Sequence, residues 1–493
     1  MNKLNWTVVY PEAWLLVAAC VVILADVFSK DSELRLTFWL AQISAAVFTA
    51  LHLSAFDTGA TAYGLSGMVV TDPMGHLLAG FAGVATMIGM AYAQPTLAAR
   101  EMLKGEFFTL SLFVLLGISV MTSANNFLVV YLGLELMSLS LYALAALRRD
   151  HAVATEAAMK YFVLGALASG FLLYGLSMMY GATGSLEIPR VFESIATGRI
   201  NKEVLTFGVV FVVAGLAFKF GAAPFHMWVP DVYQGAPTAV TLMIGGAPKL
   251  AAFAITLRLL VEGMLGLAID WQQMFIVLAV ASLVIGNLAA IAQSNLKRML
   301  AYSTISQMGF VLLGLSAGVV SGNTLSAPNA YSSSMFYIVT YVLTTLGTFG
   351  TIMFLSHQGF EAEEIEDFAG LNSRSPWAAG VMSIFLFSLA GIPPMVGFYA
   401  KLAVLQAMIT TNLTSYIVLA VVAVGMSLVG AFYYLRVVKV MYFDTPRSTQ
   451  PVQRGAGVSA LLAANGLAVL LFGMLPGGLM ALCRDAIVRA LAS

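Results

Sequence analysis

The chain consists almost entirely of continuous apolar runs of about 20 residues, separated by short polar segments. A helix of that length spans a hydrocarbon core of about 30 Å. Strands of a membrane barrel instead alternate apolar and polar residues over about ten positions. We therefore expect an all-α polytopic membrane protein with about fourteen transmembrane helices. The expected helices are centred near Val21, Ile43, Gly83, Leu115, Glu135, Ala168, Val213, Gly246, Val280, Gly309, Val342, Phe387, Ala423 and Val469.

Composition and motifs exclude most soluble functions. Of the 493 residues, 60% are hydrophobic and 10% are charged, and the formal net charge is zero. The sequence therefore lacks the basic patch that a nucleic-acid-binding protein needs. The sequence contains no GxxxxGK[ST] loop, no GxGxxG after a strand, no CxxC pair and no HExxH. Cys20 and Cys483 have no pairing or metal spacing. We expect neither a cofactor nor a metal site in this chain, so energy for transport must come from a gradient or a partner.

The short loops indicate the orientation in the membrane. The first run, AWLLVAACVVILADVF, has no clean A-x-A cleavage site, so we expect a retained first helix. Even-numbered loops are nearly free of basic residues, except that the loop between helices six and seven holds Arg190, Arg199 and Lys202. Basic loops stay in the cytoplasm, so we expect the odd loops there and both termini in the periplasm. The odd loops hold Lys30, Arg35, Arg100, Lys104, Arg148, Arg149, Lys297, Arg298, Arg374, Lys439, Arg447 and Arg454.

Two Gly-Pro segments indicate an internal duplication. Gly221 to Pro224 in helix seven and Gly391 to Pro394 in helix twelve lie five helices apart and enter the membrane from opposite sides. Proline removes a backbone hydrogen bond, so we expect both helices to be broken beside protein or water. This pattern is typical of two inverted five-helix repeats, with chance similarity as the alternative. We expect one transmembrane domain over 1–493, divided into helices 1–3 (1–106), helices 4–8 (107–262), helices 9–13 (263–443) and helix 14 (444–493).

A few ionisable residues stand out inside apolar runs, namely Glu135, Lys219, Lys249 and Lys401. A charge at membrane depth costs at least a few kcal/mol, so such residues usually face protein or water and serve ion or proton pathways. An opposite charge stabilises a protonated lysine, so Glu135 and Lys219 could bind and release a proton by approaching and separating. Two structural alternatives remain open: a static Glu135–Lys219 pair that holds two helices together, and a packing kink from which Lys401 snorkels to the surface.

Further polar residues are secondary candidates. His226 follows the break of helix seven and could relay a proton between the neighbouring lysines or bind freed carbonyls. Lys160 has Glu156 as its i−4 neighbour and could belong to the path or snorkel to the cytoplasmic face. Lys297 lies at the cytoplasmic mouth of helix ten, as a topology determinant or a residue of proton uptake. We expect Asp231 to brace its loop rather than bind an ion.

These segments resemble the antiporter-like subunits of the membrane arm of proton-pumping NADH:quinone oxidoreductase, respiratory complex I, and their Mrp-type antiporter relatives. The similarity covers essentially the whole chain, and a lysine at the helix-twelve position narrows it to one bacterial subunit type. The resemblance implies that Glu135 and Lys219 form the charge pair, that Lys249 and Lys401 are the central and outer proton carriers, and that His226 bridges them. The segments are YLGLELMSLSLYALAAL, FKFGAAPFHMWVPDVYQGAPT, GGAPKLAAF, NLKRMLAYSTISQMGF and GIPPMVGFYAKL.

The resemblance also implies the setting of the chain. It implies a multi-pass subunit of a translocase in the bacterial inner membrane, with no redox centre of its own. FMN and iron–sulfur clusters would lie in partner subunits, and quinone would be reduced elsewhere in the complex. The implied partners are other membrane-arm subunits, including another antiporter-like subunit and small membrane subunits, and the lipid bilayer.

Two alternatives stay open at this point. A stand-alone cation/proton antiporter would share the helices and lysines, and Na⁺-dependent proton flux from the purified chain would identify it. A scaffold subunit that conducts nothing would keep pumping intact after neutral substitutions at Glu135 and Lys249. The cost of the buried charges argues against the scaffold, because a scaffold leaves that cost unexplained.

Overall fold

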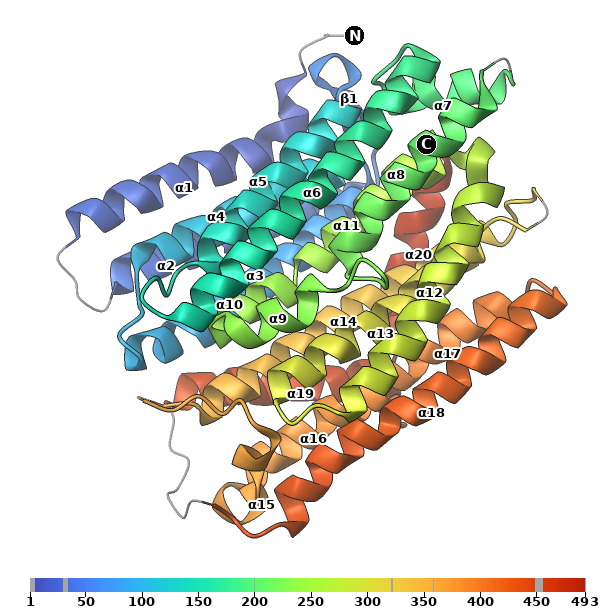
Figure 1. Ribbon diagram of the computed structural model, residues 1–493. Coiled ribbons are helices and arrows are strands. Elements are labelled where there is room, and N and C mark those ends of the chain that lie inside the picture. Colours follow the sequence, from blue (N-terminus) through green and yellow to red (C-terminus); the bar gives the residue numbers. More distant parts are fainter. Residues whose placement is uncertain are drawn as a thin grey trace.

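The computed structural model describes residues 5–29, 34–198, 200–320, 322–357, 359–447 and 455–492. Three basic residues on which the expected orientation rests, Lys30, Arg199 and Arg454, lie outside the described residues. The described chain forms a bundle of long helices packed side by side (Figure 1).

The helices follow one another with short connections, as the apolar runs predict. The first part comprises η1 (Trp6–Val9), α1 (Tyr10–Phe28), α2 (Arg35–Thr58), β1 (Ala62–Gly64), η2 (Leu65–Gly67), β2 (Val69–Thr71), α3 (Pro73–Ala99), α4 (Gly105–Thr122), α5 (Phe127–Ala145), α6 (Ala152–Thr183), α7 (Ile188–Ala196), α8 (Lys202–Phe220), α9 (Trp228–Gly235), α10 (Thr238–Gly245), α11 (Pro248–Thr256) and the π-helix η3 (Leu257–Gly263). The second part comprises η4 (Leu265–Leu267), α12 (Ala268–Ile291), α13 (Leu296–Ser316), α14 (Ala327–Leu355), η5 (Ile365–Phe368), α15 (Leu371–Arg374), α16 (Pro376–Ala390), α17 (Val396–Ile409), α18 (Thr414–Phe443), α19 (Ala456–Met474) and α20 (Gly477–Ala492). Strands β1 and β2 pair as a small antiparallel hairpin between α2 and α3.

The number of membrane crossings agrees with the apolar pattern. Within the described ranges, 13 helices are long and apolar enough to cross a membrane. The shorter apolar helices α16 and α17 lie where the twelfth crossing was expected and together supply one more. The expected all-α polytopic fold with about fourteen crossings is therefore confirmed. Helix α20 was not expected as a separate element; it follows Pro476 and carries Arg484, Asp485 and Arg489.

The expected breaks in helices seven and twelve are present. Helix α8 ends at Phe220 before α9, and α16 ends at Ala390 before α17. Each first half is followed by a glycine in the left-handed region, Gly221 with φ 76° and Gly391 with φ 84°. Only glycine adopts that conformation readily, so both positions require it. Helices α8 and α16 enter from opposite ends of the molecule (Figure 1), as inverted repeats would.

A third interruption, in helix eight, was not expected. Helix α10 ends at Gly245, and α11 begins at Pro248, whose backbone has no N–H to donate. Gly246 lies between them with φ −93° and ψ −112°, outside the helical region. After α11 the chain continues as the π-helix η3, a form that often marks functional sites. This break lies directly before Lys249.

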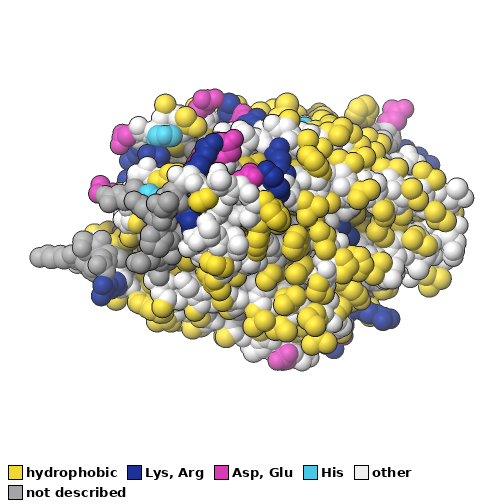
Figure 2. Space-filling view, turned by 90° about the horizontal axis from the view of Figure 1, so that it is seen from below, with side chains coloured by type: hydrophobic (Ala, Val, Ile, Leu, Met, Phe, Trp, Pro, Cys, Tyr) yellow, Lys and Arg dark blue, Asp and Glu magenta, His cyan; other side chains and the backbone are white. Residues whose placement is uncertain are grey.

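The helices divide into a buried centre and an apolar outer layer. The segment Thr238–Gly263 is 100% buried over its most apolar window, and α13 and α14 are 94% buried, whereas α18 and α19 are only 22% buried. The outer layer exposes large apolar side chains, such as Leu428 and Val27. Figure 2 shows hydrophobic side chains over much of one face, with charged side chains most numerous toward its upper left and a few at its other edges. An exposed apolar surface of this extent fits a lipid environment.

Candidate functional site

Lys249 caps the end of the first half of helix seven. It is the second residue of α11, directly after the break in helix eight, and it is 1% exposed. Its Nζ donates to the carbonyl oxygens of Lys219 and Phe220, both at 2.9 Å. These carbonyls end α8 and have no partner within the helix, and the partial negative charge of a helix C-terminus favours a cation. The ammonium also lies 5.5 Å from the centre of the Trp228 ring.

Lys401 likewise caps the end of the first half of the broken helix twelve. Its Nζ donates to the carbonyl oxygens of Leu389 and Ala390 at the end of α16, both at 3.0 Å, and to Ser427 Oγ at 2.8 Å. The side chain belongs to α17 and is 8% exposed. The ammonium therefore points to the helix end and does not snorkel to the surface. Lys401 and Ser427 also line a cavity of about 310 Å³ between α17 and α18.

The two breaks share one pattern of hydrogen bonding. Ala390 ends α16 as Phe220 ends α8, and each precedes a left-handed glycine. Ser427 Oγ on α18 donates to the carbonyl of Ala390 at 3.5 Å, as Lys249 Nζ does to that of Phe220 at 2.9 Å. In both halves, a polar group from the crossing that follows the broken helix binds the freed carbonyl. The second half has a serine at the position where the first has a lysine.

Glu135 and Lys219 lie near each other without a direct bond. Lys219 Nζ donates to Ser138 Oγ at 2.9 Å, and Ser138 lies one helical turn after Glu135 on α5. No ion pair joins Glu135 and Lys219 among the residues that the structure describes, although the two charges interact electrostatically. Within the same part of the chain, the buried Oε1 of Glu135 has no hydrogen-bond partner. The acid and the amine are thus adjacent but separated, with a serine hydroxyl on the amine.

His226 does not join the lysines into a chain of hydrogen bonds. It lies half-buried in the connection between α8 and α9. In the described part of the chain its Nδ1 is buried without a partner, and no hydrogen bond links it to Lys219, Lys249 or Lys401. A direct bridge through His226 therefore requires a rearrangement or intervening water.

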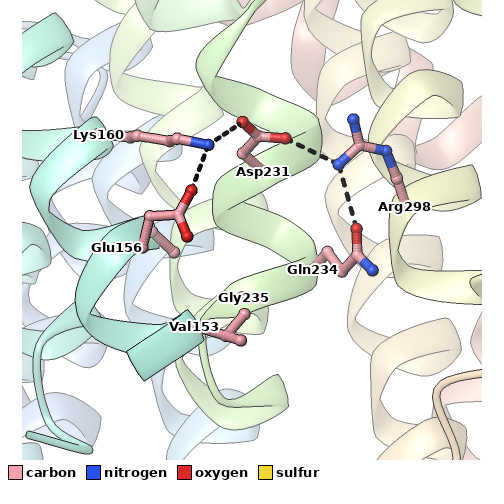
Figure 3. Close-up of a pocket in the computed structure, with 8 residues that line it drawn as sticks. Val153, Glu156, Lys160, Asp231, Gln234, Gly235 and Arg298 are labelled. Atoms are coloured by element: carbon pink, nitrogen blue, oxygen red, sulfur yellow. Dashed lines mark hydrogen bonds and ion pairs between the residues drawn. The ribbon is translucent and has the colours of Figure 1, made fainter. Parts of the chain in front are cut away.

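Lys160 and Asp231 belong to a charged cavity of about 180 Å³ at one end of α6, α9 and α13 (Figure 3). Lys160 Nζ lies 2.8 Å from Glu156, its expected i−4 neighbour, and 2.8 Å from Asp231. Asp231 also accepts from Arg298 at 2.8 Å, and Arg298 donates to Gln234 at 3.1 Å. As expected, Asp231 braces its segment, in this case by joining α6 to α13.

Lys297 is fully buried. Its position at the end of a transmembrane helix does not predict this burial. Its Nζ donates to the Ala236 carbonyl and to Glu363, both at 2.9 Å, and lies 3.6 Å from Glu361. Glu361 in turn accepts from Arg100 and from Thr238 at the start of α10. The acidic segment Glu361–Asp367 thus folds back over the ends of α10 and α13. One signal in the sequence could have revealed this contact, namely a cluster of acids expected on the same side as Lys297 and Arg298.

The surroundings of Glu361 favour its charged form. Burial alone would raise the pKa of this carboxyl, but the nearby Lys297 and Arg100 charges and the hydrogen bonds from Thr238 and Arg100 outweigh burial and lower the pKa to about 2. The carboxylate therefore stays ionised at neutral pH. It is a fixed charge, and a static brace suits it better than proton exchange.

A second buried ion pair was missed from the sequence. Arg258 of η3 is 1% exposed and binds Asp72 with both terminal nitrogens, at 2.7 and 2.8 Å. The same guanidinium reaches Glu262 at 2.8 Å and the Thr122 carbonyl at 2.9 Å. Asp72 also caps α3 through Gly75 N. An arginine inside an apolar run was the available signal, because such a residue needs a partner. Among the described residues no group of three or more His, Cys, Asp or Glu could hold a metal ion.

Interrupted helices whose ends bind buried lysines define a class, the antiporter-like membrane subunits. The model of the NADH:quinone oxidoreductase/Mrp antiporter transmembrane family matches residues 124–427. NADH-quinone oxidoreductase subunit N of Polaromonas naphthalenivorans is 62% identical over 99% of this chain and 98% of its own, and that of Herminiimonas arsenicoxydans is 61% identical over 100% of both. The chain belongs to this family and, within it, to the subunit N group. The resemblance read from the sequence is confirmed.

Solved structures agree with this assignment. A chain of respiratory complex I from Thermus thermophilus with bound Aureothin is 28% identical and superposes with a TM-score of 0.80, covering 97% of this chain and 100% of that one. A chain of the Mrp complex from Dietzia sp. has a TM-score of 0.85 at 20% identity, covering 100% of this chain and 99% of that one. The second similarity concerns the fold alone.

Proposed function

We propose that this chain is a proton-translocating subunit of the membrane arm of an NADH:quinone oxidoreductase. The observation that carries the proposal is the pair of buried ammonium groups, Lys249 and Lys401, each bound to the open end of an interrupted helix. Each ammonium can release a proton and bind it again as a neutral amine, and each is held by carbonyls that a small helix movement would take away. NADH would be oxidised and quinone reduced in other subunits that carry the FMN and iron–sulfur clusters, and this chain would have no redox centre.

Glu135, Ser138 and Lys219 would act as the switch. With Lys219 on Ser138, the ammonium and the Glu135 carboxylate are apart, and closer approach would stabilise the proton on the lysine. Separation would release it toward Lys249, whose Nζ binds the carbonyl of Lys219 itself. The switch would be set by a neighbouring membrane subunit and would share a coupling free energy with quinone reduction. His226, Lys160 and Lys297 are accessory: His226 relays through water, and the other two hold the cytoplasmic mouth.

The arrangement in the membrane belongs to the same proposal. The repeats would cover 107–262 and 263–443, with helices 1–3 before them and helix 14 after them. The odd loops would face the cytoplasm, and both termini would face the periplasm of a bacterial inner membrane. Partners would be another antiporter-like subunit and small membrane subunits of the same arm.

Co-purification tests membership of the complex. We would tag the chain in its native membrane, extract it gently and measure inhibitor-sensitive NADH:quinone reductase activity. We expect that activity in one large assembly with the chain. A chain that emerges without NADH oxidation, and that carries Na⁺-dependent proton flux in liposomes, would instead be a stand-alone antiporter.

Lys219→Ala tests the proton path. It removes the amine opposite Glu135, so we expect quinone reductase activity and proton pumping to fall together, by roughly tenfold or more, in a complex that still assembles. Lys202→Ala, at the exposed start of the same helix, is the matched control and should leave both unchanged. Normal pumping by an assembled Lys219→Ala enzyme would overturn the proposal.

A further inference from the structure

Four polar side chains form a buried row across helices α1 to α4, outside the segment 124–427 that the family model matches. Ser119 Oγ on α4 donates to Glu12 Oε1 on α1 at 2.6 Å and lies 3.3 Å from Nε2 of His52 on α2. His52 Nδ1 lies 3.0 Å from Nδ1 of His76 on α3. None of the four is more than 8% exposed. Four helices thus contribute one continuous chain of hydrogen bonds near one end of the bundle.

The contact between the two histidines restricts how many protons they hold. An Nδ1···Nδ1 hydrogen bond needs one N–H and one lone pair, so the two rings cannot both carry a proton on Nδ1. The pair therefore has room for one additional proton. Phe48, itself fully buried, packs edge-on against the His52 ring, with 4.5 Å between the ring centres.

The rest of the row has a definite direction. Because the Ser119 hydroxyl gives its hydrogen to Glu12, its lone pair is left to accept from His52 Nε2–H. In the described chain, the second carboxyl oxygen of Glu12, Oε2, is buried without a partner. A buried oxygen without a donor disfavours a carboxylate and suits a carboxylic acid. Every donor in the row points toward Glu12, so a carboxylate there, which its unpartnered oxygen disfavours, is stabilised by accepting a proton.

The charged groups around the row are already paired. Asp72 caps α3 one turn before His76 and is bound by Arg258 and Gly75 N. Arg258 and Glu262 pair with each other and line a cavity of about 340 Å³ that no member of the row lines. On the α4 side, Ser123 lies next to Glu12. The charges of Asp72 and Arg258 act on His76. Neither group is hydrogen-bonded to Ser119, so Glu12 is the acid at the other end of the row.

We propose that Glu12, Ser119, His52 and His76 form a proton-binding relay that is separate from the path of the buried lysines. A proton that arrives at His76 Nε2 lets the Nδ1 proton of His76 pass to His52 Nδ1. The Nε2 proton of His52 then passes to Ser119 Oγ, and the hydroxyl proton of Ser119 passes to Glu12. One proton enters, Glu12 becomes neutral, and no other member of the row keeps a net charge. The reverse sequence returns the proton to His76.

Histidine NMR tests the relay on the full chain in lipid bilayers, independently of the function proposed above. The protein has five histidines, so ¹⁵N-labelled side chains can be assigned with single His→Gln variants. We expect the His52 and His76 signals to change tautomer together as the pH falls, with the proton moving from Nε2 to Nδ1 on His52 and from Nδ1 to Nε2 on His76, and to show coupling across the shared Nδ1 proton. Glu12→Gln should abolish this paired change, because it removes the acid that takes up the proton. Glu203→Gln, at the exposed start of α8, is the control and should leave it unchanged.

Ser119→Ala separates a relay from simple proximity. It removes the hydroxyl between Glu12 and His52 and leaves all titrating groups in place, so we expect the effect of Glu12→Gln on the histidines to be lost in that background. The proposal is overturned if His52 and His76 titrate as independent residues. It is equally overturned if neither ring changes its tautomer at any pH in a folded chain, or if that change is insensitive to Glu12→Gln.

Discussion

At the scale of single residues, the bonds of Lys249 explain how a charge can be stable at the centre of this protein. The ammonium replaces lost water with two carbonyls, and those carbonyls need it as much as it needs them, because α8 ends there. Leaving a buried polar group without a partner costs about 1–3 kcal/mol. A structural role and a proton-carrying role therefore fall on the same atom, and a simple deletion cannot tell them apart.

Lys249→Arg distinguishes the two roles. Arginine keeps donors for the two carbonyls but does not release its proton in proteins. We expect the thermal stability of the assembled complex to stay within about 1 kcal/mol of the wild type, while proton pumping falls roughly tenfold or more. Lys249→Met, which removes the donors, should lower stability as well. If Lys249→Arg pumps at the wild-type rate, Lys249 is only a structural cap.

The sequence predicted which charged residues matter at this scale better than it predicted their partners. Glu135, Lys219, Lys249 and Lys401 stand out because each interrupts an apolar run. The carbonyls that bind the last two belong to other helices, so spacing along the chain could not reveal them. For the same reason, the sequence does not reveal that Lys219 binds the uncharged Ser138 and makes no direct bond with Glu135.

At the scale of elements, the acidic segment Glu361–Asp367 holds distant helices together through ion pairs and hydrogen bonds and is more than a polar connection; we call it a clasp for this reason. Glu361 joins Arg100 after α3 to Thr238 at the start of α10 and lies near Lys297 on α13. Its partners come from three separate parts of the chain. The hydrophobic pattern predicts only a loop here, because the role of the segment depends on tertiary contacts that no local sequence signal encodes.

Glu361→Gln should remove a pH-dependent part of the stability. The pKa of Glu361 is lowered from 4.5 to about 2, so between these values the unfolded chain binds more protons than the folded one. The contribution is complete above about pH 5 and is lost as the pH falls toward 2, and at most it amounts to about 3 kcal/mol. Acid unfolding of the variant, followed by tryptophan fluorescence, should show a lower stability at neutral pH and a flatter dependence on pH.

Glu366→Gln is the matched control in the same segment. Glu366 pairs with Arg447, and the side chains are 66% and 63% exposed. Exposed ion pairs contribute about 0–1 kcal/mol, so this variant should keep the wild-type profile. Equal acid profiles for Glu361→Gln and the wild type would contradict the assignment of Glu361 as a buried, ionised clasp.

The helix breaks show which helix boundaries the local sequence predicts and which it does not. Helices seven and twelve contain a Gly-Pro segment beside a lysine, and both break as expected. Helix eight contains Gly246 and Pro248 beside Lys249, a comparable signal, yet its apolar run is continuous, so hydrophobicity alone predicts an unbroken helix there. The separate helix α20 was missed because Arg484, Asp485 and Arg489 make it too polar for a crossing, so it was merged with the apolar run before it.

At the scale of the whole molecule, the two described ends of the chain lie on the same side of the bundle (Figure 1), as an even number of crossings requires. Which side that is depends on the basic loops alone. Arg148 and Arg149 favour a cytoplasmic α5–α6 connection, whereas Arg190 and Lys202 lie in the connection that follows α6, which the same path places on the opposite side. The positive-inside rule compares the total of Lys and Arg in the loops of the two sides and does not depend on any single loop. We therefore expect α7 to be periplasmic despite Arg190.

Cysteine labelling decides the orientation. In a background with Cys20 and Cys483 replaced by alanine, we would place one cysteine at Arg149 or at Glu193, which are both exposed. A membrane-impermeant maleimide should label Glu193→Cys in spheroplasts and Arg149→Cys only in inside-out vesicles, because the two sites lie at opposite ends of the crossings. The reverse pattern would place the basic loops outside and with them the cavity of Lys160, Asp231 and Arg298, so protons would enter that cavity from the periplasm. Labelling of both sites from the same side would contradict the alternating path of the helices, on which the inverted repeats and the lysine caps at their breaks depend.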